Sequence, residues 1–380
     1  ASTQFALTIL NLVNPVTVGT YGTFLIETQD ENNAVIDQGV GNAVDVVSDT
    51  YGYEVSKVED SNNSYCKDGD CSLREAITAA NAVGSAVTIT FDITSCYAST
   101  CVIAPTSTLP SLSSIYITID GYTQSGAIAN SATFLNPMNG TLNVQLDDAG
   151  GAFSGIVFNS HSNVVKGLII TGFSMAIDMN GPMTNNRFQG NYVGVEADGT
   201  TVNGATGGEV FKVSESFSYI GTDGDGTNDA AERNVIGTGS AFNIINLFGA
   251  TDFTIAGNYI GVGADGSTNI GGSGDGISIT SSYNIIGTDG DGTADAVEGN
   301  VISGNSNGIN TSNPDTIIAG NIIGLNAAGN AAVPNSVGIQ LWSHLTRIGT
   351  NGDGTSDTAE RNTISGNTTY GIQIDNSSTG

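Results

Sequence analysis

The sequence predicts an all-β protein whose main part is a right-handed parallel β-helix, a solenoid of stacked coils. Three observations indicate this fold. Glycine is abundant (52 residues) and proline is rare (7), a mixture typical of short strands joined by tight turns. Similar segments start at Gly190, Gly257 and Gly320, which are 67 and then 63 residues apart. Apolar pairs recur within each interval about every 16 to 26 residues, which suits one turn of a solenoid and is too short for a propeller blade.

The solenoid is expected to span residues 105–380, with strands such as FTIAGNYIG (253–261) and GISITSSYNIIG (276–287). Asn and Gly are expected at the corners, where the backbone needs left-handed angles. With neighbouring coils about 4.8 Å apart and two or three strands in each coil, one module should form roughly three coils. A leucine-rich repeat is the competing solenoid, but its L-x-x-L-x-L pattern is missing.

Residues 1–50 differ from the repeats and are expected to form a small β segment. Phe5, Leu7 and Ile9 alternate along one face, and residues 22–40 can supply two more strands. About three strands cannot enclose a core, so they must pack on the next region, belong to a longer upstream domain or pair with another chain by strand addition. The start at Ala1 and the strand-like end of the sequence favour a mature secreted chain or a fragment.

Residues 51–104 are expected to cap the solenoid, because the end of a solenoid exposes unpaired strand edges and core. The region contains the one convincing helix of the sequence. Ser72 and Glu75 form an S-x-x-E capping box, and Leu73, Ile77 and Ala80 share one helical face.

The four cysteines of the chain lie in this same region, as two C-x4-C pairs. Zinc is the alternative, but zinc sites usually have tighter C-x2-C spacing. We therefore expect two local disulfides, which imply an oxidising compartment, extracellular or at the cell surface. The expected bonds are Cys66–Cys71 and Cys96–Cys101.

The charge of the chain is strongly negative, with 37 acidic and 9 basic residues and a net charge of −28. Such a surface repels nucleic acid and anionic lipid, and it attracts cations. No apolar run approaches the roughly 18 residues that span a bilayer. Neither nucleic acid nor membrane insertion of this segment is expected.

Three acidic loops have the same length between flanking isoleucines: loop 1 (220–236), loop 2 (286–302) and loop 3 (348–364). Alternating oxygen side chains, glycines and a distal carboxylate are what Ca²⁺ requires, although the spacing is not that of an EF-hand. The alternative is that Asp and Gly only form turns. A neighbouring A-D-G turn has Asp198 and Asp265 but Ala328, whereas the loops keep their acids with one conservative change, Asn351. The candidate ligands are Asp223, Asp225, Thr227, Asp229 and Glu232; Asp289, Asp291, Thr293, Asp295 and Glu298; and Asn351, Asp353, Thr355, Asp357 and Glu360.

Catalysis has weak support in the sequence, and no catalytic residue is assigned. His161 and His344 lack glycine or acidic neighbours, and we expect them at the surface or at corners. Arg233 and Arg361 follow loop glutamates, so we expect them to neutralise the carboxylates.

A line of exposed aromatic side chains would favour glycan binding. Trp342 is the one tryptophan of the chain, whereas the module tyrosines lie inside strand patterns, so we expect them to stack in the core. These tyrosines are Tyr192, Tyr219, Tyr259 and Tyr283.

Two stretches of the chain resemble a known family. CSLREAITAANA (71–82), ITFD (89–92) and LPSLSSIYITIDG (109–121) are similar to the CSLREA-type region of bacterial cell-surface proteins. The G-N-Y-I-G and I-G-T modules resemble the right-handed parallel β-helix repeats that follow this region, so that the resemblance covers roughly residues 55–380. It implies a secreted or cell-surface β-helix within a larger multidomain protein, and it implies no reaction.

The sequence therefore predicts a non-catalytic structural or adhesive protein, a calcium-stabilised rod outside the cell. The strands of residues 1–50 suggest self-association, as in a filament or larger surface assembly, and cell-surface glycans are candidate partners. A polysaccharide lyase, a glycoside hydrolase or a carbohydrate-binding β-helix is the alternative.

Overall fold

The computed structural model describes residues 19–29, 35–46, 53–63, 66, 69–97, 99–148, 153–204, 208–238, 243–342 and 345–375. The chain divides into two units, Ala1–Gly52 and Tyr53–Gly380. Phe5, Leu7 and Ile9, from which the first N-terminal strand is predicted, lie outside the described residues. In the first unit, β1 (Gly19–Gln29) and β2 (Val35–Val46) pair antiparallel, so the two strands expected from residues 22–40 are confirmed.

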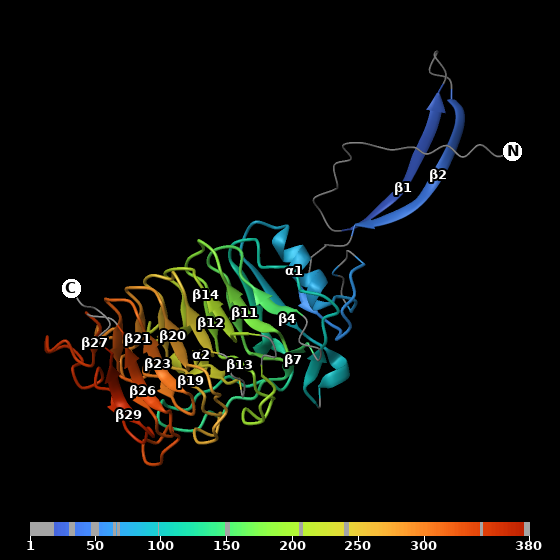
Figure 1. The fold of residues 1–380 in the computed structure, drawn as a ribbon. Coiled ribbons are helices and arrows are strands. Elements are labelled where there is room, and N and C mark those ends of the chain that lie inside the picture. Colours follow the sequence, from blue (N-terminus) through green and yellow to red (C-terminus); the bar gives the residue numbers. More distant parts are fainter. Residues whose placement is uncertain are drawn as a thin grey trace. The chain divides into compact units, whose positions relative to one another are not determined.

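The second unit is a parallel β-helix, as predicted, built from three long sheets (Figure 1). The first sheet contains β3 (Glu54–Val55), β4 (Val87–Phe91), β6 (Ile117–Asp120), β9 (Val164–Lys166), β12 (Arg187–Gln189), β15 (Tyr219–Gly221), β18 (Thr254–Ala256), β21 (Ile285–Gly287), β24 (Ile317–Ala319) and β27 (Arg347–Ile348). The second contains β5 (Cys101–Ile103), β7 (Val144–Asp147), β10 (Leu168–Thr171), β13 (Tyr192–Val193), β16 (Val235–Ile236), β19 (Tyr259–Ile260), β22 (Val301–Ile302), β25 (Ile322–Ile323) and β28 (Thr363–Ile364). The third contains β8 (Ser154–Val157), β11 (Met175–Met179), β14 (Phe211–Val213), β17 (Ile245–Leu247), β20 (Ile277–Ile279), β23 (Asn307–Thr311), β26 (Val337–Leu341) and β29 (Tyr370–Ile374).

One sequence module forms two coils, so the prediction of roughly three coils is wrong. Each coil takes one strand from each sheet, and the three acidic loops follow β15, β21 and β27, with one coil between successive loops. In the intervening coils the same corner is a tight Gly-Asn turn, and the A-D-G turn lengthens the next corner instead. Every coil of the repeated region thus carries one long loop, which explains why two coils need 63 to 67 residues.

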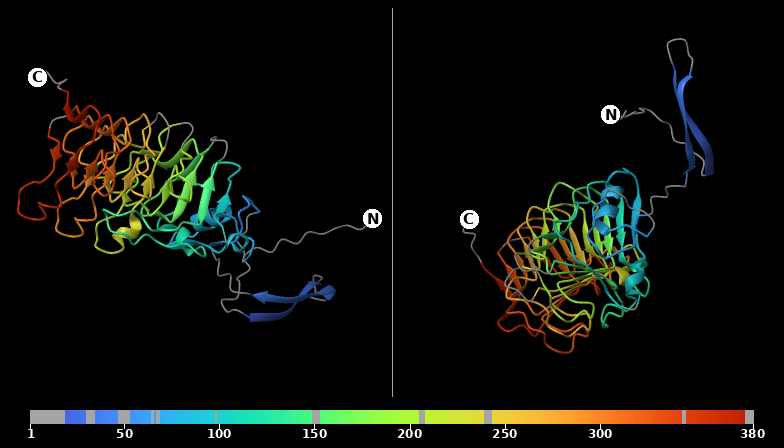
Figure 2. Two further views of the ribbon diagram at one scale, coloured as in Figure 1. Left: turned by 90° about the horizontal axis from the view of Figure 1, so that it is seen from below. Right: turned by 90° about the vertical axis from the view of Figure 1, so that its right-hand side faces the viewer.

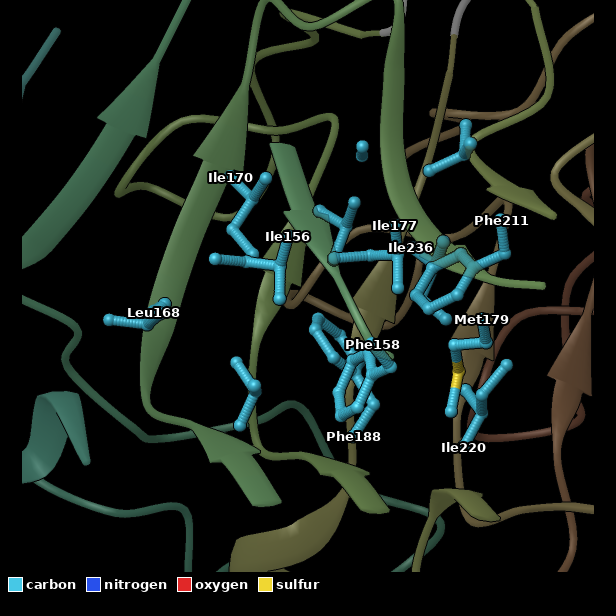
Figure 3. Packing of buried hydrophobic residues seen from close by; sticks show 14 of the residues in the cluster. Ile156, Phe158, Leu168, Ile170, Ile177, Met179, Phe188, Phe211, Ile220 and Ile236 are labelled. Atoms are coloured by element: carbon cyan, nitrogen blue, oxygen red, sulfur yellow. The ribbon is translucent and has the colours of Figure 1, made fainter. Parts of the chain in front are cut away.

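The core consists of inward columns of apolar side chains that continue from coil to coil. Ile236, Ile260, Ile302 and Ile323 are in register in the second sheet. Equivalent isoleucine columns run along the other two sheets. Figure 3 shows side chains from all three sheets meeting inside the coil, where the rings of Phe188 and Phe211 lie 5.1 Å apart, edge to face. Each strand offers few inward residues, so burial comes from stacking, and a single coil has no core of its own.

Asparagine at the corner after the first sheet has a different role from the one predicted. The glycine of the Gly-Asn turn takes the left-handed angle, with φ +76° at Gly257 and at Gly320. The asparagine points inward and donates a hydrogen bond from Nδ2 to Oδ1 of the asparagine in the next coil; all members of this series are buried except the last, Asn362, which is half-buried. This ladder runs through Asn191, Asn234, Asn258, Asn300, Asn321 and Asn362 with distances of 3.3, 2.8, 3.0, 3.0 and 3.1 Å.

Residues 53–103 cover one end of the solenoid and also extend its sheets through β3, β4 and β5. The predicted helix is α1 (Leu73–Asn81), which packs against β3 and β4. Its capping box is confirmed: Ser72 Oγ accepts the N–H of Glu75, and Glu75 Oε2 accepts the N–H of Ser72 at 2.9 Å. The face with Leu73, Ile77 and Ala80 is buried, as predicted. Short 3₁₀ turns follow at Thr94–Cys96 and Gly121–Thr123.

The predicted disulfides Cys66–Cys71 and Cys96–Cys101 are both present. Each bond closes a short local loop within the end region. Since the four thiols are used in these bonds and no cysteine of the chain is free, the zinc alternative is excluded.

Residues 121–143, which we call the strap, leave the coil pattern, although they fall within the predicted solenoid of residues 105–380. The strap packs against outward-facing residues of the second sheet, such as Tyr192 and Tyr259, and against the corner before this sheet, next to coils far away in sequence. Tyr122 Oη donates to the carbonyl of Gly190 at 2.7 Å, and Met138 N–H donates to the carbonyl of Ala264 at 2.8 Å. The strap therefore crosses several coils and braces them against one another.

Candidate metal sites in the acidic loops

The acidic loops all lie on one corner of the β-helix, where the first sheet ends (Figure 2). Each loop is closed by the same hydrogen bond, which a threonine near the loop start donates to an aspartate seven residues later. The bonds are Thr222 Oγ1 to Asp229 Oδ1, Thr288 Oγ1 to Asp295 Oδ1 and Thr350 Oγ1 to Asp357 Oδ1, each 2.7 Å long. In loop 1, α2 (Asp229–Glu232) adds a helical turn that the sequence patterns do not predict.

A second position is also explained by local turn chemistry. Asp225, Asp291 and Asp353 each accept the backbone N–H of the threonine two residues later, at 2.7, 2.6 and 2.7 Å. These threonines are Thr227, Thr293 and Thr355, and the group that contacts the aspartate is the backbone N–H in each case. Turn formation therefore accounts for part of the repeated acidic pattern.

Two groups of carboxylates nevertheless lie close enough to hold a metal ion. Asp223, Asp225 and Asp229 in loop 1 have oxygens within 4.8 Å of one another, and so have Asp289, Asp295 and Glu298 in loop 2. Among the described residues, no equivalent group forms in loop 3, and Glu232 and Asp291 lie outside the two clusters.

Glu298 is the most unusual acid of the loops. The residue is 5% exposed, and its Oε2 has no hydrogen-bond partner in the described part of the chain. Burial, together with the charges of Asp289 and Asp295, raises the pKa of Glu298 to about 8. Burial also raises the pKa of Asp289. Although burial opposes it, hydrogen bonds from Ser356 and Thr288 hold the pKa of Asp295 below its usual value. Loop 2 thus holds closely spaced carboxyl groups, of which Asp295 is compensated by hydrogen bonds and Glu298 Oε2 is not.

Successive loops are stacked through their glutamates. Gly224 and Gly290 have positive φ angles of +70° and +77°. A Cβ atom on Gly224 would overlap the carboxylate of Glu298, and one on Gly290 would overlap that of Glu360. Each glutamate therefore lies beneath the loop two coils earlier, which is why both the angle and the space require glycine there.

Basic side chains distinguish the three loops. In loop 1, Arg187 Nε lies 2.8 Å from Asp223 Oδ2. Loop 3 has a similar pair, since Arg347 Nη1 lies 2.7 Å from Glu360 Oε1. Both arginines lie in one column of the first sheet. Tyr219, Ile285 and Arg347 directly precede loops 1, 2 and 3 in this column, and Arg187 lies one coil before Tyr219. Across the described residues, no salt bridge reaches the acids of loop 2.

The prediction that Arg233 neutralises the loop carboxylates is wrong. Arg233 is buried and points toward the strap, where it donates to the carbonyls of Ala132 and Phe134, both at 3.1 Å. Its guanidinium also lies 4.9 Å from the ring centre of Tyr259. Arg361 is exposed, and no salt bridge of this residue is found in the described structure. Adjacency to Glu232 does not bring Arg233 to the carboxylates, because carbonyl groups of the strap accept its N–H groups instead.

The A-D-G turns provide an internal comparison. Asp198 Oδ1 and Asp265 Oδ1 accept two backbone N–H groups each, from Thr200 and Thr201 and from Ser267 and Thr268. Where the third copy has Ala328, Asn326 Oδ1 accepts the N–H groups of Asn330 and Ala331 instead. Local hydrogen bonding explains this turn, whereas it leaves Glu298 Oε2 in loop 2 unexplained.

The aromatic and histidine predictions are confirmed in part. His161 is exposed, as expected. Tyr192 and Tyr259 are buried, but they pack against the strap in two clusters separate from the coil core, so their predicted place in the core is wrong. Tyr283 is 58% exposed, so its placement in the core is wrong. Its φ of +63° places it at a left-handed corner position before the strand, where the side chain points outward. Tyr219 is only partly buried, with Arg187 over its ring, and His344 lies outside the described residues.

Comparison with known proteins returns no match, since neither a family model nor a curated protein sequence aligns with the chain. In the part of the chain that the structure describes, no helix is long and apolar enough to cross a membrane.

Proposed function

We propose that this chain is a non-catalytic structural rod of an extracellular or cell-surface protein, stabilised by Ca²⁺ in its acidic loops. The observation that carries the proposal is the buried, unpartnered carboxylate oxygen of Glu298 beside Asp289 and Asp295. A hard cation with oxygen ligands would remove both the repulsion and the desolvation cost at this point. Two disulfides and a CSLREA-like end region agree with a location outside the cell.

The three loops differ in how their negative charge is balanced. Loop 2 has no basic partner in the described structure, so its cation should contribute most to stability. In loop 1 the cation would share Asp223 with Arg187, and binding should be weaker. In loop 3 the guanidinium of Arg347 already lies at the glutamate, and Asn351 replaces the first acid. We therefore assign Ca²⁺ to loops 1 and 2.

Thermal unfolding in Ca²⁺ and in EDTA tests this function. Ca²⁺ at 100 times its Kd should add about 2.7 kcal/mol of stability for each site. Asp289→Asn should remove the increment that comes from loop 2, because it takes a carboxylate from that loop. Asp265→Asn is the matched control, since an asparagine can keep the A-D-G turn, and this variant should retain the full increment. Equal melting temperatures of the unchanged chain in Ca²⁺ and in EDTA would refute the proposal.

We further propose that the first unit joins copies of the chain into a filament by strand addition. Its sheet consists of two strands of 11 and 12 residues, each with one edge unpaired within the described residues. Two strands are marginal as an isolated sheet, and a free edge is a template for another strand. Electron microscopy of the chain and of a variant without residues 1–48 tests this idea: filaments that persist in the shorter variant would exclude it.

A further inference from the structure

A cavity of about 500 Å³ lies on the outer face of the first sheet, beside loop 1. Strands β6, β9 and β12 form its floor, the strap lines one side and loop 1 lines the other. Its size falls within the range of about 300–1,000 Å³ that is typical of small-molecule sites. The strap and loop 1 are more than 70 residues apart in sequence, so only the folded coils create this cavity.

The floor of the cavity contains a buried donor without a partner. Gln189 is 6% exposed, lines the cavity, and its Nε2 has no hydrogen-bond partner among the described residues. Asp223 Oδ1, on the loop side, is a buried acceptor that also has no partner there. A cation in loop 1 would occupy the Asp223 oxygen, but nothing proposed above would satisfy Gln189. An unpaired buried amide is costly, which indicates a ligand that accepts a hydrogen bond from it.

The charges around the cavity are balanced. Lys166 Nζ lies 3.0 Å from Asp120 Oδ2, and Arg187 Nε lies 2.8 Å from Asp223 Oδ2. An anionic ligand would meet Asp223 and Glu232, and a cationic ligand would meet Lys166 and Arg187. The site therefore favours a neutral ligand that both donates and accepts hydrogen bonds. Hydroxyl groups do both, since each has one donor and two acceptor positions.

The cavity also offers apolar surface beside these polar groups. The ring of Tyr122 and the side chains of Val164, Ala129 and Ala231 line it. Tyr122 is fixed in place, because its Oη donates to the carbonyl of Gly190. A sugar ring presents a C–H face to such a surface and hydroxyl groups at its rim. An amphipathic aromatic side chain suits this kind of contact.

We propose that this cavity binds a neutral saccharide, with Gln189 as a donor to a sugar oxygen and Glu232 of loop 1 as an acceptor from a hydroxyl group. The site gives the rod a glycan-binding surface in addition to its structural role. It does not depend on the cation of loop 2, which lies in a different loop.

Titration calorimetry with a panel of disaccharides tests the proposal. Neutral disaccharides of glucose, galactose, mannose, xylose and N-acetylglucosamine are compared with digalacturonate and with the glucosamine dimer. At least one neutral sugar should bind. Gln189→Met keeps the length of the side chain but loses its amide, and it should weaken that binding about tenfold. Gln340→Met is the matched control, because Gln340 is also 6% exposed in a strand but lies outside the cavity, and it should leave binding unchanged.

Three results would overturn this assignment: no binding of any neutral sugar, binding of the charged sugars alone, or neutral binding that Gln189→Met leaves unchanged. The melting temperature of each variant shows whether it folds, and Lys166→Met supplies a second change to the cavity if Gln189→Met does not fold. Asp289→Asn separates this site from the calcium proposal, because it removes a ligand of loop 2 and should bind the sugar as the unchanged chain does.

Discussion

Arg347 donates a hydrogen bond of 2.7 Å to Oε1 of the buried Glu360, in a loop whose sequence repeats that of loop 2. Two coils earlier, Glu298 occupies the same place with isoleucine at the arginine position. Both loops therefore contain a buried glutamate carboxylate, but its charge is balanced in different ways. In loop 3 the chain supplies a cation of its own, and we propose that in loop 2 a bound Ca²⁺ takes this part.

The change Arg347→Ile together with Asn351→Asp should convert loop 3 into a cation-dependent loop. Loss of the guanidinium leaves Glu360 buried and unpaired, which should destabilise the protein by about 2–4 kcal/mol in EDTA. Ca²⁺ should restore a large part of this loss, as measured by chemical unfolding. The control Arg361→Ile changes an exposed arginine of the same loop and should stay within about 0.5 kcal/mol. A double variant that Ca²⁺ cannot rescue would contradict the equivalence of arginine and metal.

Asn258→Ala should interrupt the asparagine ladder in its middle. The amide of Asn258 accepts from Asn234, donates to Asn300, and donates to the carbonyl of Ile220 at 2.8 Å. Its loss leaves buried groups unpaired, and we expect a cost of about 3 kcal/mol in the free energy of unfolding. The exposed Asn136→Ala is the comparison and should change this quantity by less than about 0.5 kcal/mol. Similar stability of both variants would show that the ladder contributes little.

Glu215 should make stability depend on pH near neutrality. The residue is fully buried, accepts from Asn186 Nδ2 at 2.8 Å, and burial raises its pKa to about 7. Because the folded pKa lies above the unfolded value, the contribution of this group is complete below about pH 4.5 and is lost as pH rises through 7. Glu215→Gln should therefore stabilise the protein at pH 8.5 relative to the unchanged chain, by an amount on the order of 3 kcal/mol. Unfolding curves at pH 5 and pH 8.5 measure this, and equal differences at both values would contradict it.

The fold could be predicted because the repeated segments carry their inward isoleucines at positions that stacking preserves. The capping box of Ser72 and Glu75 and the two cysteine pairs were also predictable, since each depends on residues close together in sequence. The number of coils in a module was not, because an apolar pair does not show how much chain a corner loop uses. The role of asparagine in the Gly-Asn corners was predicted wrongly for a related reason. Gly257 takes the left-handed angle, whereas Asn258 is needed for its hydrogen bonds to asparagines in the adjacent coils.

The residues around the sites show where sequence reasoning ends. Arg187 reaches Asp223 from an earlier coil, and Gln189 faces a cavity that the strap helps to form. Neither relationship can be found by examining the loop itself. One signal was available in the sequence: Arg187 and Arg347 both directly precede an inward apolar residue, which places them in one column once the coils are aligned. The prediction for Arg233 was wrong because adjacency to Glu232 in sequence does not determine where the arginine side chain points.

Anomalous diffraction from a crystal of this chain soaked with Tb³⁺, a substitute for Ca²⁺, tests the central claim most directly. The account predicts one peak among Asp289, Asp295 and Glu298, a second and weaker peak among Asp223, Asp225 and Asp229, and none at Glu360 beside Arg347. Empty difference maps at both clusters, or a peak in loop 3 as strong as that in loop 2, would contradict it.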